Sequence, residues 1–413
     1  MLQKMSFLNM RTKRKKIIIV SSFRPRDCGI ATFSHDLANS LKLHTNDIEF
    51  EIIPINEKGG EDRTYNIPVN CKIEQQDINS YERAAFYINN SEAVAVSLQH
   101  EFGLHGGKCG EYVINFLERV KKPVLTTLHT VLLKPSKEEK NILRQIADLS
   151  SALIVMASTG SKILTKTYGI DKKKIMIIPH GVPDIELCDQ KSAKKTFGLE
   201  DRLILSTFGL ISSGKGIEYV IEALPRIKME HDNVLYLILG KTHPGVIAYE
   251  GERYRDRLIS KIKALDLLDN VKFINRFVDI EEYISYLKAT DLYLTPYLNP
   301  QQVTSGTLVY AMSAGRICIS TPYLHAKELH RDGHKMFLVP FRNSKSIAKT
   351  VTKLLSNDQL RKKMETENHK FSRSMTWERV SENYAGIIRS LAKEDLKINY
   401  QLAYSETQVL PTH

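Results

Sequence analysis

The stretch TPYLNPQQVTSGTLVYAMSAGRICISTPYLHA, residues Thr295–Ala326, has the pattern of a strand end, a polar loop, a helix and a second strand. Ser305 stands at the position of a helix N-cap, followed by Gly306 and Thr307, and Gly315 marks the end of the predicted helix. The first turn of a helix leaves backbone N–H groups unpaired and favours phosphate, and a glycine there lets a ligand approach closely. An ordinary capped helix has the same pattern, so a ligand site is indicated only if the arrangement recurs.

Short β-rich runs alternate with helical patterns along the rest of the chain, which predicts parallel sheets with crossover helices. The predicted strands are Ile17–Ser21, Phe50–Ile53, Val94–Leu98, Val124–Leu128, Leu153–Met156 and Lys174–Ile178, then Leu203–Phe208, Val234–Leu239, Val271–Ile274, Leu292–Thr295, Ile317–Ser320 and Phe337–Val339. Each half resembles one doubly wound domain. Turn formers and acids at Pro179–Gln190 interrupt the pattern and indicate the boundary between the halves.

Length and composition limit the class of protein. The chain has 413 residues, of which 42% are hydrophobic and 26% charged, as in a soluble globular protein of two or three domains. It contains no apolar run long enough to span a membrane and no signal-peptide core. The five cysteines are widely spaced and include no Cys-x-x-Cys pair, so neither a disulfide framework nor a zinc site is expected. We therefore expect a cytoplasmic protein.

Positive charge is concentrated at the N-terminus. The net charge is +12, and residues 1–16 supply half of it with six lysines and arginines and no acid. Apolar residues among them would allow peripheral contact with an anionic membrane, and a solvated arm fits the same composition. The remaining charge is thinly spread and no basic motif is interleaved with aromatic residues, so we expect no nucleic-acid partner.

Ligands in open parallel sheets bind beyond the carboxyl ends of the strands. The residues that follow predicted strands include Gly29 in the loop Cys28-Gly29-Ile30, His100 and Glu101, His129, and the loop Gly209–Gly216. Glycines, polar groups and imidazoles thus gather at one end of two sheets, which predicts a cleft. His129 could bond a sugar hydroxyl or stabilise charge on a reacting group, although a structural histidine would have the same place in the sequence.

Two motifs in these loops resemble known metal or nucleotide motifs only in part. GLISSGKG, at Gly209–Gly216, nearly fits the P-loop, but Gly216 replaces the hydroxyl residue that would hold Mg²⁺. What remains is Lys215, a cation near a helix N-terminus that suits a diphosphate or is simply a solvated lysine. In HEFGLH, His100 and His105 are five residues apart, so the zinc spacing fails.

Six segments in this order resemble family four of the GT-B-fold glycosyltransferases, which are retaining and use nucleotide sugars. They are PRDCGIATFSHDL (25–37), TTLHT (126–130), KIMIIPHGVPD (174–184), FGLISSGKGIEYVIEAL (208–224), ATDLYLTPY (289–297) with the loop and helix after it, and TWERVSENYAGII (376–388). The similarity extends from about residue 16 to residue 390.

The resemblance implies an α/β fold of the GT-B type, with two doubly wound parallel-sheet (Rossmann-like) domains facing a central cleft. It divides the chain into a basic arm (1–16), an acceptor domain (17–183), a nucleotide-sugar domain (184–372), helices that cross back to the first domain (373–395) and a tail (396–413). The implied reaction moves a hexose from a UDP- or GDP-sugar to a glycan or lipid-linked acceptor, without a metal or other cofactor.

The resemblance also assigns roles to single residues. It implies catalytic roles for His129, Lys215 and Gln302. The implied donor-binding residues are Gly29, Gly209, Lys215, Ser305, Gly306, Thr307, Leu308 and Tyr310, and His180 is an implied acceptor or cleft residue. His100 and Glu101 are expected as acceptor or cleft residues from their place after a predicted strand, where loop-capping hydrogen bonds are the alternative.

The chain departs from the family pattern at three positions of the expected donor site. Gln302 and Tyr310 occupy the places of the Glu-x7-Glu pair, and Leu210 replaces an arginine after the glycine. A carboxylate bonds hydroxyls more strongly than an amide or phenol does, so donor binding must differ here. Two alternatives therefore stay open, namely a GT-B-type sugar phosphorylase and a non-catalytic homologue that binds a glycan or a partner transferase.

Overall fold

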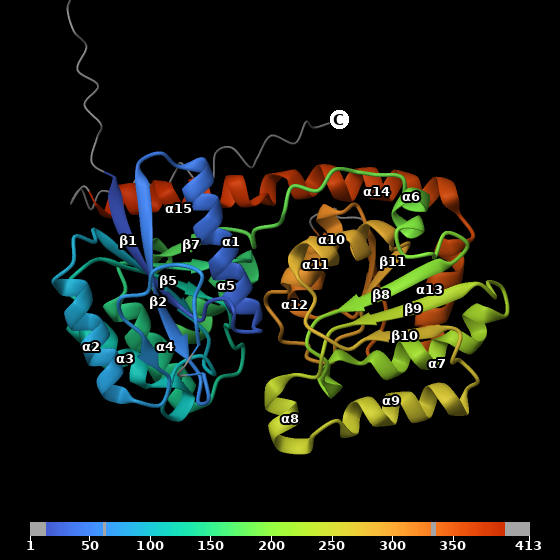
Figure 1. Cartoon of the computed structure of the whole chain (residues 1–413), viewed down its shortest axis with the longest axis horizontal. Coiled ribbons are helices and arrows are strands. Elements are labelled where there is room, and N and C mark those ends of the chain that lie inside the picture. Colours follow the sequence, from blue (N-terminus) through green and yellow to red (C-terminus); the bar gives the residue numbers. More distant parts are fainter. Residues whose placement is uncertain (1–13, 61–62, 332–335, 393–413) are drawn as a thin grey trace, which may run out of the picture.

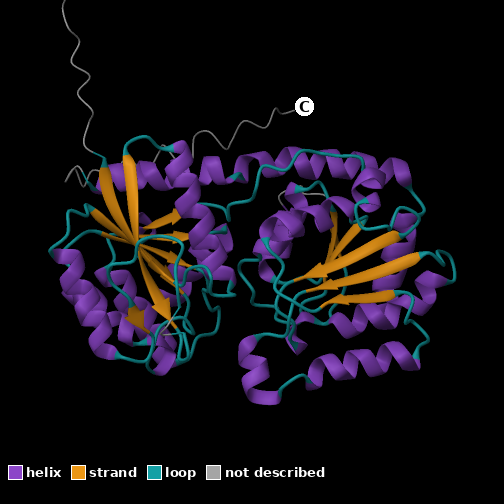
Figure 2. Cartoon of the chain, viewed as in Figure 1, coloured by secondary structure: helices purple, strands orange, loops and turns teal. Residues whose placement is uncertain are grey.

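The computed structural model describes residues 14–60, 63–331 and 336–392, in which two parallel sheets lie side by side (Figures 1 and 2). Within these residues the first sheet has seven strands in the order β3-β2-β1-β4-β5-β6-β7. Its strands are β1 (Lys15–Ser21), β2 (Ile48–Asn56), β3 (Ile73–Glu74), β4 (Ala95–His100), β5 (Val124–Leu128), β6 (Ala152–Val155) and β7 (Ile175–Ile177). The helices between them are α1 (Gly29–His44), α2 (Ile78–Asn89), α3 (Tyr112–Arg119), α4 (Lys137–Leu149) and α5 (Ser158–Ile163).

The apolar run of β1 shows why this sheet forms. Ile17 and Ile19 pack with α1 on one face, whereas Ile18 and Val20 pack with α2 and α3 on the other. A strand that is buried on both faces must be apolar throughout, which is the pattern of a parallel sheet covered by helices.

The second sheet has six described strands in the order β10-β9-β8-β11-β12-β13. They are β8 (Leu203–Phe208), β9 (Val234–Leu239), β10 (Val271–Ile274), β11 (Leu292–Thr295), β12 (Ile317–Ser320) and β13 (Met336–Leu338). The helices are α6 (Gln190–Lys195), α7 (Ile217–Lys228), α8 (Pro244–Glu250), α9 (Arg253–Ala264), α10 (Ile280–Ala289), α11 (Gly306–Ser313), α12 (Leu324–Arg331), α13 (Ser344–Leu355) and α14 (Asp358–Ser372). In register, Leu203 of β8 faces Val234 of β9 and Phe208 faces Leu239.

The predicted fold class is confirmed, and all twelve predicted strands are present with end shifts of a few residues. The sequence pattern missed β3, because a strand of two residues has no detectable periodicity. The helix of the opening stretch is α11, which begins directly after Ser305 as predicted. Its last turn is followed by Gly315 with φ +75°, a left-handed conformation that favours glycine.

The C-terminal helix α15 (Trp377–Leu391) follows α14 along one side of both sheets and packs against α1 (Figure 1). Its Tyr384 hydroxyl bonds the Thr127 hydroxyl at 2.9 Å, and Arg389 forms a bidentate pair with Asp47 at 2.6 and 2.8 Å. The chain after the second sheet is thereby held against the first sheet. Most of the predicted arm (1–16) and the tail (396–413) lie outside the described residues. None of the described helices is long and apolar enough to cross a membrane.

Candidate active site

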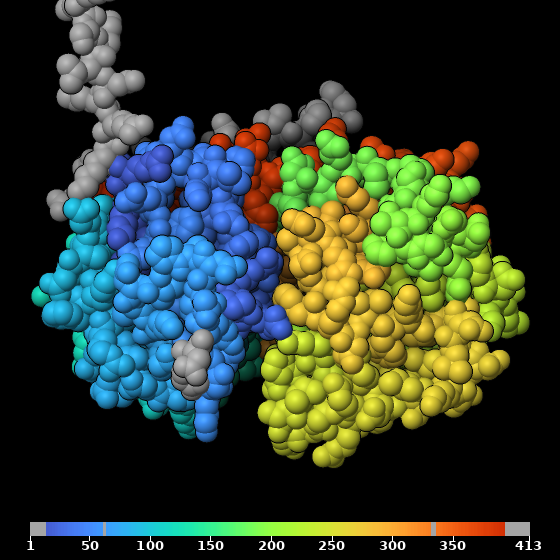
Figure 3. Space-filling model, in the orientation of Figure 1, coloured from blue at the N-terminus to red at the C-terminus, as the bar shows by residue number. Residues whose placement is uncertain are grey.

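A cavity of about 840 Å³ lies between the two domains at the carboxyl ends of their strands. In the space-filling view a groove separates the two halves of the molecule (Figure 3). The first domain lines the cavity with the loop Arg24–Ile30, which follows β1, and with residues after β4 and β5. The second domain lines it with residues after β8 and β9 and with the start of α11.

Most of the predicted site residues line this cavity. They are Gly29, Glu101, His129, His180, Gly209, Lys215, Gly306, Thr307 and Tyr310. Those that do not line it are His100, Gln302, Ser305 and Leu308.

Lys215 ends a short 3-10 turn, Ser213–Lys215, just before α7. Its ammonium lies over the Tyr297 ring, 4.0 Å from the ring centroid, and has no carboxylate within ion-pair distance among the described residues. Gly209 has φ +129°, and its carbonyl oxygen would lie 2.2 Å from a Cβ on Gly240. The close backbone packing after β8 and β9 therefore requires a glycine at position 240, while a Cβ on Gly209 would meet the Lys215 ammonium at 3.6 Å. Lys215 thus lies directly beside the backbone of Gly209, where its ammonium can face an anion.

The N-terminus of α11 also faces the cavity. Its N-cap, Ser305, has extended backbone, and its side chain does not cap the helix, while its N–H donates to His325 Nδ1 at 3.0 Å. The amides of Gly306 and Thr307 belong to the first turn and have no partner within the helix, so they can bind an anion. The Leu308 side chain is fully buried in the core, so only its backbone could take part in the expected donor contact.

His129 follows β5 on the first-domain side of the cavity. Its Nε2 lies 2.9 Å from the Gln99 carboxamide oxygen, while the Gln99 nitrogen contacts the Ser97 hydroxyl at 3.3 Å. The carboxamide oxygen only accepts, so Nε2 carries the proton and Nδ1 keeps its lone pair. Burial, with a smaller effect of the nearby His180, lowers the pKa of His129 to about 3. The ring is therefore neutral at physiological pH and suited to hydrogen bonding rather than to ion pairing.

His180 fills the space between the two domains. Its ring makes edge contacts with Phe33 at 5.2 Å and Tyr310 at 5.8 Å, and it lies 6.0 Å from the Trp377 ring. Its Nδ1 donates to the Gly181 carbonyl at 2.8 Å, and burial lowers its pKa. This ring therefore has a fixed position directly behind the first turn of α11.

The Tyr310 hydroxyl is already engaged by other side chains. It donates to the Asp36 carboxylate at 3.1 Å and accepts from the Trp377 indole N–H at 3.3 Å. Asp36 belongs to α1, so this contact joins the two domains. The expected role of Tyr310 as a donor ligand would require the hydroxyl to leave this network.

Two expectations differ from the structure. His100 was expected to face the cleft, but it is fully buried, because β4 continues to this residue and its ring stacks on His105 with centroids 5.7 Å apart. Gln302 lies outside the cavity, because its side chain donates to the Thr304 carbonyl at 2.9 Å. Glu101 does line the cavity, and burial raises its pKa.

Several ionisable residues of the cavity were not predicted from the sequence. They are Arg24, Arg26, Asp27, Glu57, Arg63, Lys241 and His243. Glu57 pairs with Arg26 at 3.2 Å and with Arg63 at 2.6 Å. Lys241 comes two residues after the end of β9, so the strand-end rule could have singled it out.

The second domain matches a known family. Residues 189–371 match the family model described as Glycosyl transferases group 1. An uncharacterized glycosyltransferase of Methanocaldococcus jannaschii is 24% identical over 258 residues, which span 61% of this chain and 62% of that protein. A phosphatidyl-myo-inositol mannosyltransferase of Mycolicibacterium smegmatis is 24% identical over 247 residues, 59% of each protein.

Solved structures resemble the whole two-domain arrangement. HepE of Anabaena in complex with UDP superposes with a TM-score of 0.68 at 16% identity. The match covers 91% of this chain and 100% of the HepE chain. Sucrose-phosphate synthase of Thermosynechococcus elongatus superposes with a TM-score of 0.73 at 14% identity. The match covers 92% of this chain and 99% of the synthase chain. The fold is therefore GT-B. Residues 189–371, less than half of the chain, are thus similar to group 1 glycosyl transferases, and the chain spans about three fifths of the length of the two relatives named above.

Proposed function

We propose that the protein is a retaining glycosyltransferase of family four, which moves a hexose from a UDP- or GDP-sugar to a hydroxyl of a glycan or lipid-linked acceptor. One observation carries this proposal. Lys215 and the first turn of α11 line the second-domain side of the same cavity that His129 lines from the first domain. An anion site thus faces a neutral hydrogen-bonding group across a space large enough for a nucleotide sugar.

In the proposed reaction the bond between the sugar's anomeric carbon and the diphosphate breaks, and the diphosphate leaves with negative charge. Lys215 and the amides of Gly306 and Thr307 would stabilise that charge, so the step needs no metal ion. The acceptor hydroxyl attacks from the face that the diphosphate leaves and gives its proton to the leaving phosphate oxygen. No carboxylate nucleophile is required in this mechanism.

His129 has a separate role in this proposal. Because its ring stays neutral, it would hold a hydroxyl of the transferred sugar rather than pair with the diphosphate. Gln99 fixes the ring through the 2.9 Å hydrogen bond and thereby decides which nitrogen accepts.

The comparisons support the choice of substrates. UDP is the ligand in the HepE structure, and the mycobacterial relative is a mannosyltransferase for phosphatidyl-myo-inositol. A nucleotide-sugar donor, a lipid-linked acceptor and a cytoplasmic location at the inner membrane face are therefore parts of this proposal.

Thermal-shift screening tests the donor part first. The protein is heated with UDP, GDP, ADP, their sugar conjugates or inorganic phosphate, each with EDTA present. A ligand that binds the folded state raises the melting temperature, so one nucleotide should stand out for the wild type and lose its effect in Lys215→Ala. A response to phosphate alone would favour a phosphorylase, and a response to glycans alone would favour a binding protein. With the donor known, NMR of the product's anomeric centre tests retention.

A further inference from the structure

Charge is divided unequally between the two walls of the cavity. The second domain contributes the lysines Lys215 and Lys241 to the described lining and no carboxylate, while burial lowers the pKa of its His243. The three carboxylates that line the cavity, Asp27, Glu57 and Glu101, all belong to the first domain. The first-domain wall also carries Arg24, Arg26 and Arg63, so positive and negative groups balance there, whereas the second-domain wall has an excess of positive charge. A nucleotide sugar carries one negative charge on each of its two phosphates, and Lys215 and Lys241 are the two lysines of that wall.

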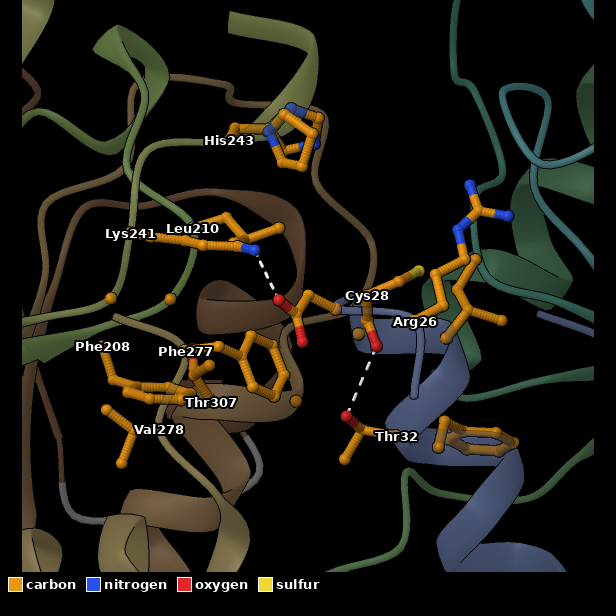
Figure 4. A pocket seen from close by; sticks show the side chains of 18 of the residues that line it. Arg26, Cys28, Thr32, Phe208, Leu210, Lys241, His243, Phe277, Val278 and Thr307 are labelled. Carbon is orange, nitrogen blue, oxygen red and sulfur yellow. Dashed lines mark hydrogen bonds and ion pairs between the residues drawn. The ribbon is translucent and has the colours of Figure 1, made fainter. Parts of the chain in front are cut away.

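Lys241 lies beside the expected phosphate site. The Lys241 carbonyl accepts a hydrogen bond from the Ile211 N–H at 2.9 Å. This bond places Lys241 next to Leu210, where the chain leaves β8 and β9. The close-up shows the Lys241 side chain extending past Leu210 into the cavity (Figure 4). Its ammonium forms an ion pair with Asp27, which comes from the first-domain loop before α1.

This ion pair has the properties of a contact that another anion can replace. The Lys241 and Asp27 side chains are 35% and 39% exposed. Exposed ion pairs contribute little to stability, since water screens both charges. A phosphate at the same place would offer Lys241 a charge-assisted bond of the same kind, without the need to bring in a residue of the other domain.

We propose that Lys241 is a second diphosphate-binding cation of the donor site, and that Asp27 is its counter-ion until the donor binds. This inference rests on the proposed function. When the donor enters, a phosphate oxygen takes the place of the Asp27 carboxylate on the Lys241 ammonium. Because the two residues belong to different domains, donor binding then also removes one contact between the domains.

The proposal predicts opposite effects for the two partners. The dissociation constant of UDP, or of GDP if the screen selects it, is measured by titration calorimetry for wild type, Lys241→Met, Asp27→Asn and the double variant. Lys241→Met should weaken binding at least about tenfold, the scale of one charged hydrogen bond. Asp27→Asn should tighten it about twofold to fivefold, because a competing anion is removed. In the Lys241→Met background, Asp27→Asn should change nothing, and Lys241→Arg should retain binding.

A second ion pair provides the control. Lys261 and Glu222 form a pair with exposures of 35% and 32% that lies outside the cavity lining. Lys261→Met and Glu222→Gln should leave the dissociation constant unchanged. Circular dichroism of each variant confirms that it is folded.

The outcomes separate this inference from the proposed function. If Lys241→Met and Asp27→Asn both weaken binding, or both leave it unchanged, the pair is a structural contact and the inference is overturned alone. If the wild type binds no nucleotide, the proposed function fails and the inference fails with it.

Discussion

Two glycines at the cavity provide a matched pair of substitutions. Gly29 and Gly306 are the first residues of α1 and α11, and both line the cavity. A Cβ on Gly306 would lie 2.7 Å from Nε2 and 3.0 Å from Cε1 of His180, closer than the 3.4 Å at which ordinary contact begins. A Cβ on Gly29 would meet no atom within 4 Å. Neither backbone is left-handed, so only the available space differs between the two sites.

The size of the effect follows from how firmly His180 is held. Its ring is packed against Phe33, Tyr310 and Trp377, and its Nδ1 is bonded to the Gly181 carbonyl. Because the ring has no free space to enter, the first turn of α11 must shift instead. Overpacking of this kind lowers the free energy of unfolding by about 1–3 kcal/mol. Gly29→Ala should be neutral or stabilising by up to about 1 kcal/mol, since alanine restricts the unfolded chain.

Urea unfolding of Gly306→Ala and Gly29→Ala measures this difference, and His180→Ala is added in a double-mutant cycle. Removing the His180 ring should abolish most of the cost of Gly306→Ala, because the clash has a single partner. Gly306→Ala should also weaken nucleotide binding, since the amides of the first turn move. Equal stability of the two alanine variants, or an unchanged cost in the His180→Ala background, would refute the assigned contact.

Three further predictions concern charge. Lys215→Ala should lower turnover at least about tenfold in a steady-state assay, whereas Lys228→Ala, at the far end of α7, should not. Burial lowers the pKa of His105 to about 4, below the unfolded value of about 6.5. Its neutral ring thus contributes full stability above pH 6.5 and loses it as the pH falls toward 4. When the pH is lowered from 7.5 to 5.5, the free energy of unfolding of the wild type should fall by about 1.4 kcal/mol relative to that of His105→Gln. A difference between the two proteins that does not change with pH would contradict this. Glu328→Ala should lower the free energy of unfolding, measured in urea, by about 1–3 kcal/mol, because the N–H groups of Ser158 and Thr159 lose their acceptor. As a control, replacing the exposed Glu382 with alanine should leave the free energy of unfolding unchanged.

The sequence predicted the fold well because buried parallel strands leave a strong signal. Each strand with apolar side chains on both faces is a continuous apolar run, and the helices between the runs have their own periodicity. The strand-end rule then placed Lys215, Gly306 and His129 at one cavity, since parallel strands carry their carboxyl ends to the same edge.

The sequence could not predict which neighbours each side chain meets. His100 was misplaced because β4 continues through it, so its ring belongs to the sheet rather than to the loop. The Tyr310 contact with Asp36 and the Lys241 contact with Asp27 depend on how the two domains dock. No local pattern encodes that docking, because the paired residues are hundreds of positions apart.

The contacts between the domains differ in how easily a ligand could replace them. Glu328 is 8% exposed and accepts the Ser158 and Thr159 N–H groups at 2.7 and 2.8 Å, so its carboxylate is held by two donors away from water. The pair of Lys241 and Asp27 is more than a third exposed and lies in the cavity itself. A phosphate that displaces Asp27 would therefore leave the buried contact of Glu328 in place. Donor binding can then change the cavity wall while the domains stay docked, so Asp27→Asn should alter donor affinity far more than it alters the urea midpoint.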